Sequence, residues 1–208
     1  IIKINRLFNI QGALSFEPNP RVFSVLNKKT NYLQNKKRVF KNFINIKTNP
    51  TDQERSGRCW LFAFLNVIRI PMIKKYNLEE DFEFSQNFLF FYDKLEKANY
   101  FFNYIIENKN IKLDDLKLIY MLDNLTNDGA QWNMFVNLIN KYGIIPKSNM
   151  DDHFHSKESN SLNSFFNDFL RKSCKQLRET KEPKDNILNN LLEECYKILV
   201  LFLGEPPK

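Results

Sequence analysis

At residue 59 the chain passes from a polar stretch into a strongly apolar one, and this junction limits how the protein can fold. The stretch 48–57 is polar and carries Pro50, so it predicts an irregular loop. From Cys59 to about Lys75, apolar residues recur on most sides of a predicted helix: Leu61, Phe62, Phe64, Leu65, Ile68 and Met72. Such a helix needs partners on more than one face. Pro71 is expected to kink or end it.

The rest of the chain also predicts helices. Twenty phenylalanines against five glycines favour bulky helical packing over a turn-rich β protein. Ser85 is a suitable N-cap for a helix over 86–103, and Gly143 is expected to close a helix over 131–142. Further helices are expected over 21–43, 113–125, 161–179 and 185–203, with a polar, exposed loop over 153–160. The sequence therefore predicts a mostly α chain.

The net charge of +7 is concentrated near the N-terminus. Residues 1–50 hold ten Lys and Arg against one acidic residue, and the remainder is close to neutral. A basic arm attracts polyanions such as nucleic acid. The plainer interpretation is a solvated helix face in a Lys- and Asn-rich sequence, and both stay open. The apolar run 88–92 is too short to span a bilayer and residues 1–6 lack a secretory leader, so no membrane partner is expected.

The three cysteines do not predict a disulfide framework. Their number is odd, and Cys174 and Cys195 fall on predicted helices, where free cysteine packs as a small hydrophobe. A reducing compartment, the cytoplasm, is the simpler expectation.

Cys59 has the position of a nucleophile. A helix N-terminus favours a thiolate, because its unpaired N–H groups and dipole attract negative charge. Acyl transfer also needs donors aimed at the developing oxyanion, and the Gln53 side chain and the Cys59 backbone N–H are the candidates. Trp60 is expected either to pack under the site or to be plain core.

The run Ser56-Gly57-Arg58-Cys59-Trp60 resembles the papain-like cysteine peptidases, and within them the bleomycin hydrolase (aminopeptidase C) branch. Secreted members carry a disulfide-forming cysteine where this chain has Ser56, so that disulfide cannot form here. Further blocks in register carry the resemblance: 65–75, 83–94, 127–132, 136–137, 141–147 and 203–207.

The resemblance implies a papain-like α+β fold of which this chain holds the helical half with the nucleophile. The β-rich half, with the catalytic histidine and asparagine, is missing. Residues 1–50 would be a basic arm and helix, 51–149 the helical half of the catalytic domain, and 150–208 the start of a helical insertion. The implied function is a cysteine aminopeptidase acting on peptides by a Cys-His-Asn mechanism, without a cofactor or metal.

The resemblance also implies where a substrate lies and how subunits assemble. The family has Gly-Gly beside the extended substrate, where this chain has Gly129 and Ala130, flanked by Asp128. Together with Trp60 these residues form the expected substrate site. Ala130 is strained if its position needs a positive φ, and narrows the cleft if it needs only close approach. Family members form hexameric rings with basic channels that bind nucleic acid non-specifically.

The only two histidines are not expected to do chemistry. His153 and His155 lie in the polar stretch 153–160, and two histidines without cysteine or glutamate at ligand spacing are a weak metal signal. The competing function is a catalytically inactive homologue that serves as a nucleic-acid- or protein-binding ring component. Peptide hydrolysis that depends on Cys59 would separate the two.

Overall fold

The computed structural model describes residues 48–207. The predicted helix over 21–43 and nearly all of the basic arm 1–50 lie outside this range. Within 48–207 the chain is helical and contains no strand, only two isolated bridges that pair Arg55 with Glu158 and Phe84 with Pro146. The predicted mostly α chain is confirmed for the residues that are described. No helix in this range combines the length and apolarity that crossing a membrane requires.

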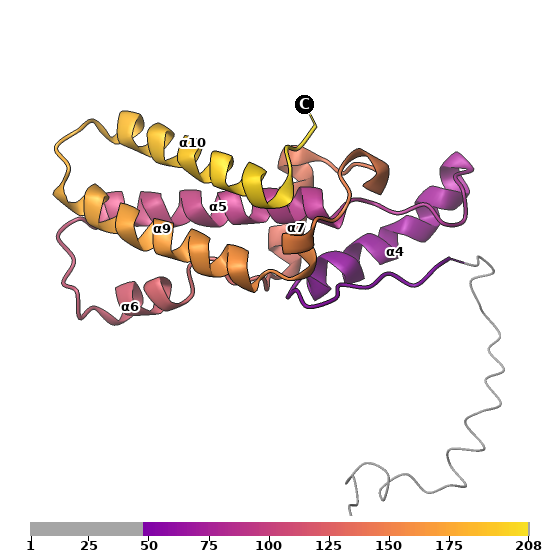
Figure 1. The fold of residues 1–208 in the computed structure, drawn as a ribbon, viewed down its shortest axis with the longest axis horizontal. Coiled ribbons are helices and arrows are strands. Elements are labelled where there is room, and N and C mark those ends of the chain that lie inside the picture. The colour runs from indigo at the N-terminus through magenta and orange to yellow at the C-terminus, as the bar shows by residue number, and fades with distance from the viewer. Residues whose placement is uncertain (1–47, 208) are drawn as a thin grey trace, which may run out of the picture. The chain divides into compact units, whose positions relative to one another are not determined.

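The helices follow one another with short connections (Figure 1). Their bounds are α4 Cys59–Tyr76, α5 Gln86–Glu107, α6 Leu116–Asp123, α7 Trp132–Tyr142, a 3-10 turn η1 Lys147–Asn149, α8 Phe154–Lys157, α9 Asn160–Glu179 and α10 Lys184–Leu203. The predicted loop over 153–160 was wrong, because α8 forms inside it and α9 begins within it.

Two other expectations need correction. Of the two alternatives expected at Pro71, a kink or an end, the end was wrong, because α4 continues to Tyr76 and closes on Asn77 in the left-handed conformation, with φ 50°. The proline sits on an exposed side of the helix, near Val67, where water can solvate a carbonyl that loses its partner. The helix predicted over 113–125 begins only at Leu116, because the Asp115 carboxylate caps the first turn.

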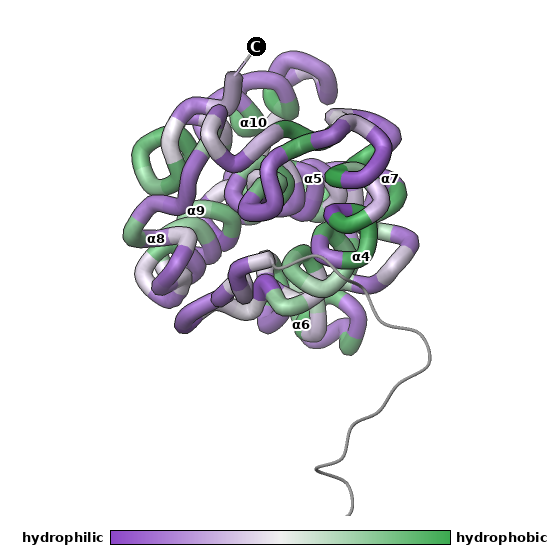
Figure 2. Tube along the Cα trace, turned by 90° about the vertical axis from the view of Figure 1, so that its right-hand side faces the viewer, coloured by the Kyte–Doolittle hydropathy of each residue, from purple (hydrophilic) through white to green (hydrophobic). Residues whose placement is uncertain are grey.

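Helix α5 is the centre of the described residues. It packs against α10, α9, α7 and α4, which surround it when viewed end-on in Figure 2. Its aromatic and aliphatic residues supply much of the core: Phe88, Leu89, Phe90, Phe91, Ala98, Phe101, Phe102, Tyr104 and Ile105. Because apolar side chains leave α5 on most sides, helices must cover it from most sides.

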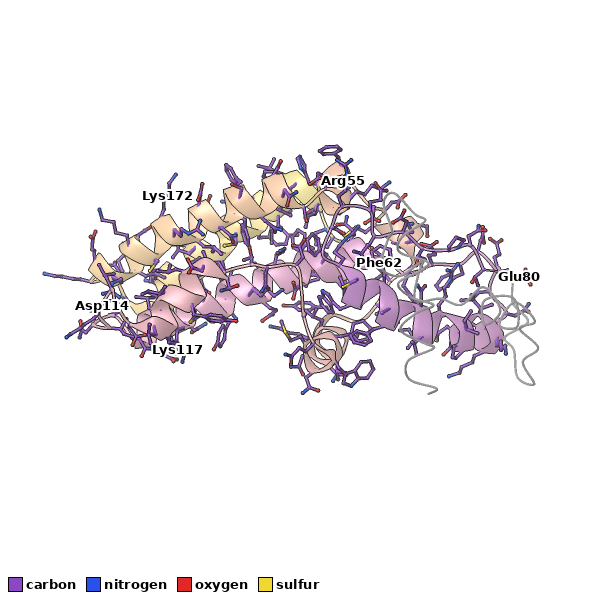
Figure 3. The ribbon with its side chains drawn as sticks, turned by 90° about the horizontal axis from the view of Figure 1, so that it is seen from below. Arg55, Phe62, Glu80, Asp114, Lys117 and Lys172 are labelled. Atoms are coloured by element: carbon purple, nitrogen blue, oxygen red, sulfur yellow. The ribbon has the colours of Figure 1, made fainter. Side chains whose placement is uncertain are left out.

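The two long C-terminal helices are amphipathic, as predicted. Cys174 on α9 and Cys195 on α10 both face the core, which confirms their expected buried positions. Figure 3 shows Phe62 on the packed side of α4, whereas charged side chains such as Lys172 lie on the outside.

Ser85 ties the start of α5 to a distant segment. Its hydroxyl accepts from the Phe88 N–H at 3.0 Å, which confirms the predicted N-cap. The same hydroxyl donates to the Met150 carbonyl at 2.5 Å. One buried side chain therefore satisfies a helix-end donor and a loop acceptor at once.

Replacing Ser85 by alanine should lower the free energy of unfolding by about 2 kcal/mol, because it removes a cap and leaves two buried groups unpaired. Denaturant unfolding of the two proteins would measure the difference. The matched control is Ser148→Ala, since Ser148 is exposed. Equal stabilities of the two variants would contradict this role.

Candidate active site

Cys59 is the first residue of α4 and is exposed. No side chain caps this end of the helix, whose preceding residue is Arg58. The first N–H groups of a helix have no partner within it, so this end can accept an anion beside the thiol. The predicted placement of the cysteine at a loop–helix junction is confirmed.

The turn before Cys59 is held by Gln53 and Ser56. The Gln53 amide nitrogen donates to the Ser56 carbonyl at 2.9 Å, and the Ser56 hydroxyl donates to the Gln53 carbonyl at 2.7 Å. The amide group of Gln53 has a second N–H, which leaves a donor for another acceptor. The structure thus places Gln53 in the same turn as the nucleophile candidate, and its role toward an oxyanion stays a prediction.

Arg58 is fully buried directly before Cys59. Its Nη1 pairs with the Asp152 carboxylate at 2.5 Å, and its Nε donates to the Ser56 hydroxyl at 2.9 Å. The guanidinium also lies over the rings of Phe62 and Phe90, at 5.2 and 5.5 Å from their centroids. Sequence reasoning missed this role, because a charged residue is seldom fully buried unless it is paired.

Asp128 receives four donors on its carboxylate. Oδ2 accepts from the Gly57 N–H at 3.0 Å and the Ser159 hydroxyl at 2.5 Å. Oδ1 accepts from the Lys94 ammonium at 2.7 Å and the Asn163 amide at 2.8 Å. The carboxylate of Asp128, a residue predicted to bind substrate, is therefore already hydrogen-bonded by four groups of this chain.

The Lys94–Asp128 pair is ionic. Burial alone would raise the pKa of Asp128, but the Lys94 charge and the hydrogen bonds from Lys94, Ser159 and Gly57 hold that pKa well below its usual range. Burial lowers the pKa of Lys94 to about 8, against the opposing pull of Asp128. The carboxylate is therefore ionised at neutral pH, and most of the lysine is charged.

The loop from Thr126 to Gly129 turns all four of its carbonyls toward side chains. Lys94 donates to the Thr126 carbonyl. Lys97, one turn further along α5, donates to the carbonyls of Asn127 at 2.6 Å and Gly129 at 3.1 Å. The Trp60 indole donates to the Asp128 carbonyl at 2.6 Å. Three side chains thus fix the backbone of this loop.

Trp60 lies in the core beneath Cys59. It is 5% exposed and meets the Phe135 ring edge-on, with 6.4 Å between centroids. Its indole bond to the Asp128 carbonyl joins the residue after the nucleophile to the expected substrate loop. The structure therefore brings Cys59, Trp60 and the loop of Gly129 together, as the sequence predicted.

Ala130 is not strained. Among the described non-glycine residues, only Glu54 and Asn77 have a positive φ, so the strained alternative for Ala130 was wrong. Within residues 48–207 the Ala130 N–H and C=O have no hydrogen-bond partner. Gly129 beside it is exposed, and a Cβ there would meet no atom within 4 Å.

The two histidines pack at the C-terminal end of α10, away from any cluster of ligands. The His153 ring lies so close to Gly204 that a Cβ there would come within 2.6 Å of Nε2. His155 meets the rings of Phe154 and Phe202 at 5.1 and 4.7 Å. In the part of the chain that the structure describes, no three His, Cys, Asp or Glu side chains form a metal-binding group.

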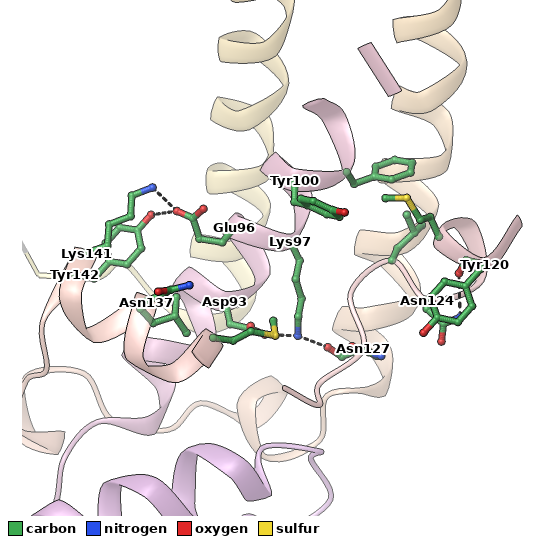
Figure 4. A pocket seen from close by; sticks show the side chains of 15 residues that line it. Asp93, Glu96, Lys97, Tyr100, Tyr120, Asn124, Asn127, Asn137, Lys141 and Tyr142 are labelled. Carbon is green, nitrogen blue, oxygen red and sulfur yellow. Dashed lines mark hydrogen bonds and ion pairs between the residues drawn. The ribbon is translucent and has the colours of Figure 1, made fainter. Parts of the chain in front are cut away.

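A cavity of about 450 Å³, which no sequence motif had indicated, opens between α5, α6 and α7 (Figure 4). Its wall is mostly aromatic and aliphatic, with residues that include Tyr100, Phe101, Met121, Met134 and Leu138. Lys97 lines it too, and reaches from there to Asn127 and Asp93. On another side Glu96 accepts from Lys141 and from Tyr142.

Known proteins resemble this chain along most of its length. A model described as "Peptidase C1-like family" matches residues 18–208. Bleomycin hydrolase of Gallus gallus is 38% identical over 179 residues, or 82% of this chain and 39% of that protein. Aminopeptidase C of Listeria innocua is 45% identical over 161 residues, or 76% and 36%. The chain spans about two fifths of the length of these relatives.

A further relative and a solved structure are also similar to most of this chain. The protein named "Cysteine proteinase 1, mitochondrial" from Saccharomyces cerevisiae is 39% identical over 206 residues, or 95% of this chain and 42% of that protein. The crystal structure of PepW from Lactobacillus rhamnosis superposes with a TM-score of 0.80 at 34% identity, covering 96% of this chain and 45% of that one.

The three thiols should differ sharply in reactivity. Cys59 is exposed, whereas burial raises the pKa of both Cys174 and Cys195 and so disfavours their thiolates. In the native protein, iodoacetamide should modify Cys59 first, and the other two only after unfolding. Peptide mapping by mass spectrometry, with and without guanidinium, would measure each rate. Modification of all three at one rate in the native state would contradict the described packing.

Proposed function

We propose, since this chain belongs to the Peptidase C1-like family, that the protein is a cysteine aminopeptidase in which Cys59 attacks the peptide carbonyl. Family membership and the likeness to PepW confirm the papain-like fold class that the sequence predicted. The observation that carries the proposal is the exposed thiol at the uncapped start of α4. A thiol there has N–H groups beside it to stabilise both thiolate and oxyanion.

The proposed mechanism divides its roles between this chain and residues outside it. The Cys59 N–H and the second N–H of the Gln53 amide would stabilise the oxyanion. We assign the base and its orienting group to a histidine and an asparagine outside these 208 residues, as the resemblance implies. The packing of His153 against Gly204 and of His155 against Phe202 supports this assignment.

The substrate backbone is proposed to pass Gly129 and Ala130. The Ala130 N–H and C=O, without partners in residues 48–207, form a short edge with which an extended peptide can pair. The carbonyls just before this edge are bound by Lys97 and Trp60, so the loop does not need to be ordered when substrate arrives. The Ala130 methyl group narrows this part of the cleft relative to a glycine.

Removal of N-terminal residues, a hexameric ring and a cytoplasmic location complete the proposal. The relative named aminopeptidase C supports the exopeptidase activity. The ring and the cytoplasm rest on the family resemblance, and the yeast relative is named mitochondrial. The competing function is that of a catalytically inactive homologue, a ring component that binds nucleic acid or protein.

Replacing Cys59 by alanine should abolish peptide hydrolysis, because no other exposed thiol lies in the chain. Cleavage of fluorogenic aminoacyl amides by the full-length protein would measure it. The exposed control Ser148→Ala should keep full activity.

Cleavage that survives Cys59→Ala would refute the proposed nucleophile. A folded wild-type protein with reduced thiols and no cleavage would instead favour an inactive homologue. In that case, nucleic-acid affinity that falls steeply with salt would identify the basic arm as the functional part.

Replacing Ala130 by glycine should change KM and leave kcat nearly unchanged, because the methyl group meets the substrate backbone away from the reacting carbon. The positive-φ argument does not apply here, so the variant should not be stabilised by relief of strain. Steady-state kinetics with a series of aminoacyl amides would measure both constants. An unchanged KM would refute the proposed path of the substrate.

A further inference from the structure

Two segments far apart in the sequence are joined through a single residue, Asp128, by its side chain and by its backbone carbonyl. Residues 57–60 carry the nucleophile and residues 126–130 carry the expected substrate edge, and Asp128 bonds to both neighbours of the Arg58–Cys59 pair. We propose that Asp128 is a positioning residue, which fixes the nucleophile turn and the substrate loop relative to each other. The inference rests on the proposed peptidase function. It concerns how residues 57–60 and residues 126–130 are held in a fixed position relative to each other.

Asp128 forms hydrogen bonds with one residue before Cys59 and one residue after it. Its carboxylate accepts from the Gly57 N–H, two residues before the thiol, at 3.0 Å. Its own carbonyl accepts from the Trp60 indole, one residue after the thiol, at 2.6 Å. It acts on Cys59 only through these neighbours, and a shift of the loop must move them with it.

Gly57 and Asp128 are also in close steric contact. A Cβ on Gly57 would lie 2.6 Å from the Asp128 Cβ, nearer than real side chains approach. Glycine at position 57 is therefore required by the approach of the loop and not by a positive φ. The second residue of the run Ser56-Gly57-Arg58-Cys59-Trp60 must therefore be glycine for the loop of Asp128 to come this close.

The charge of Asp128 is needed because every contact around its carboxylate is a donor. Lys94 from α5 approaches Oδ1, and Ser159, the residue before α9, approaches Oδ2. An asparagine would fit the space, but its NH₂ group would face a donor on one side. Loss of one partner in a buried ion pair also leaves the other charge without compensation.

Ser159 and Asn163 donate to the Asp128 carboxylate, and both lie outside residues 51–149, the segment expected to form the helical half of the catalytic domain. Both residues belong to the segment 150–208, which the resemblance assigned to an insertion. They orient the carboxylate that orients the nucleophile turn. The start of α9 is therefore a support of the active site as well as part of a helical layer.

Asp128→Asn in the full-length protein tests this role. Amide hydrogen exchange followed by mass spectrometry should become faster in peptides covering 54–62 and 126–131, because both segments lose a common anchor. In addition, kcat should fall and KM should rise, with kcat/KM reduced about 100-fold, as small misplacements of reacting groups typically cost. Ala130→Gly, by contrast, should move KM alone.

The matched control is Leu199→Ala, which removes a fully buried side chain from α10. It destabilises the protein through a cavity without touching Asp128. It should leave exchange in 54–62 and 126–131 and the ratio kcat/KM within twofold of wild type. If Asp128→Asn gives the same pattern as Leu199→Ala, the residue is merely structural and the inference is overturned.

Two additional variants keep the test decisive if Asp128→Asn does not fold. Gly57→Ala forces a methyl group against Asp128 and should reproduce the faster exchange, whereas Gly129→Ala meets open space and should not. Equal exchange in the two glycine variants would overturn the inference. Wild-type protein without peptidase activity would refute the proposed function alone, because the exchange comparison would still decide the positioning role.

Discussion

The buried pair of Lys94 and Asp128 is the interaction on which the candidate site depends. Lys94 comes from α5, the helix that the others surround, and Asp128 from the loop before α7. An isolated charge at either position would be expensive, so each residue requires the other in place. Pairing them places the loop on the core helix. Lys94 also binds the Thr126 carbonyl, and Lys97 and Trp60 bind the carbonyls of Asn127, Asp128 and Gly129. The ionic contact and the four carbonyl bonds together hold the loop that carries the proposed substrate edge.

A second buried ion pair, Arg58 with Asp152, holds the turn before Cys59. Arg58 is held by Asp152 and by the Ser56 hydroxyl, and lies over two aromatic rings. Buried ion pairs contribute little net stability, but they penalise any arrangement in which a partner is missing. Arg58 binds the Asp152 carboxylate, and the Gly57 N–H donates to the Asp128 carboxylate. Charged groups from two different segments therefore fix the backbone next to Cys59. The thiol itself stays exposed and uncommitted.

Local signals in the sequence were sufficient for much of the fold and for the position of Cys59 at the start of a helix. Ser85 as an N-cap, Gly143 after a helix and the apolar period of α9 and α10 act within a few residues, and these predictions were confirmed. Where a competing local group was overlooked, as with Asp115, the helix bounds were wrong. The partners of Asp128 lie 31 to 71 residues away, and a period-based reading treats Lys94 and Arg58 as solvent-facing charges. Long-range pairing of this kind is visible only in three dimensions.

The replacement of a disulfide-forming cysteine by Ser56 now has a physical meaning. A disulfide at this turn would brace it covalently, but would depend on oxidising surroundings. The Ser56 hydroxyl instead donates to Gln53 and accepts from Arg58, whose guanidinium reaches Asp152. This brace needs no oxidation, and Cys59 beside it is the only exposed one of the three free cysteines. A turn held by hydrogen bonds and charge can therefore present a reduced, reactive thiol under conditions in which a disulfide-braced turn would lose its support.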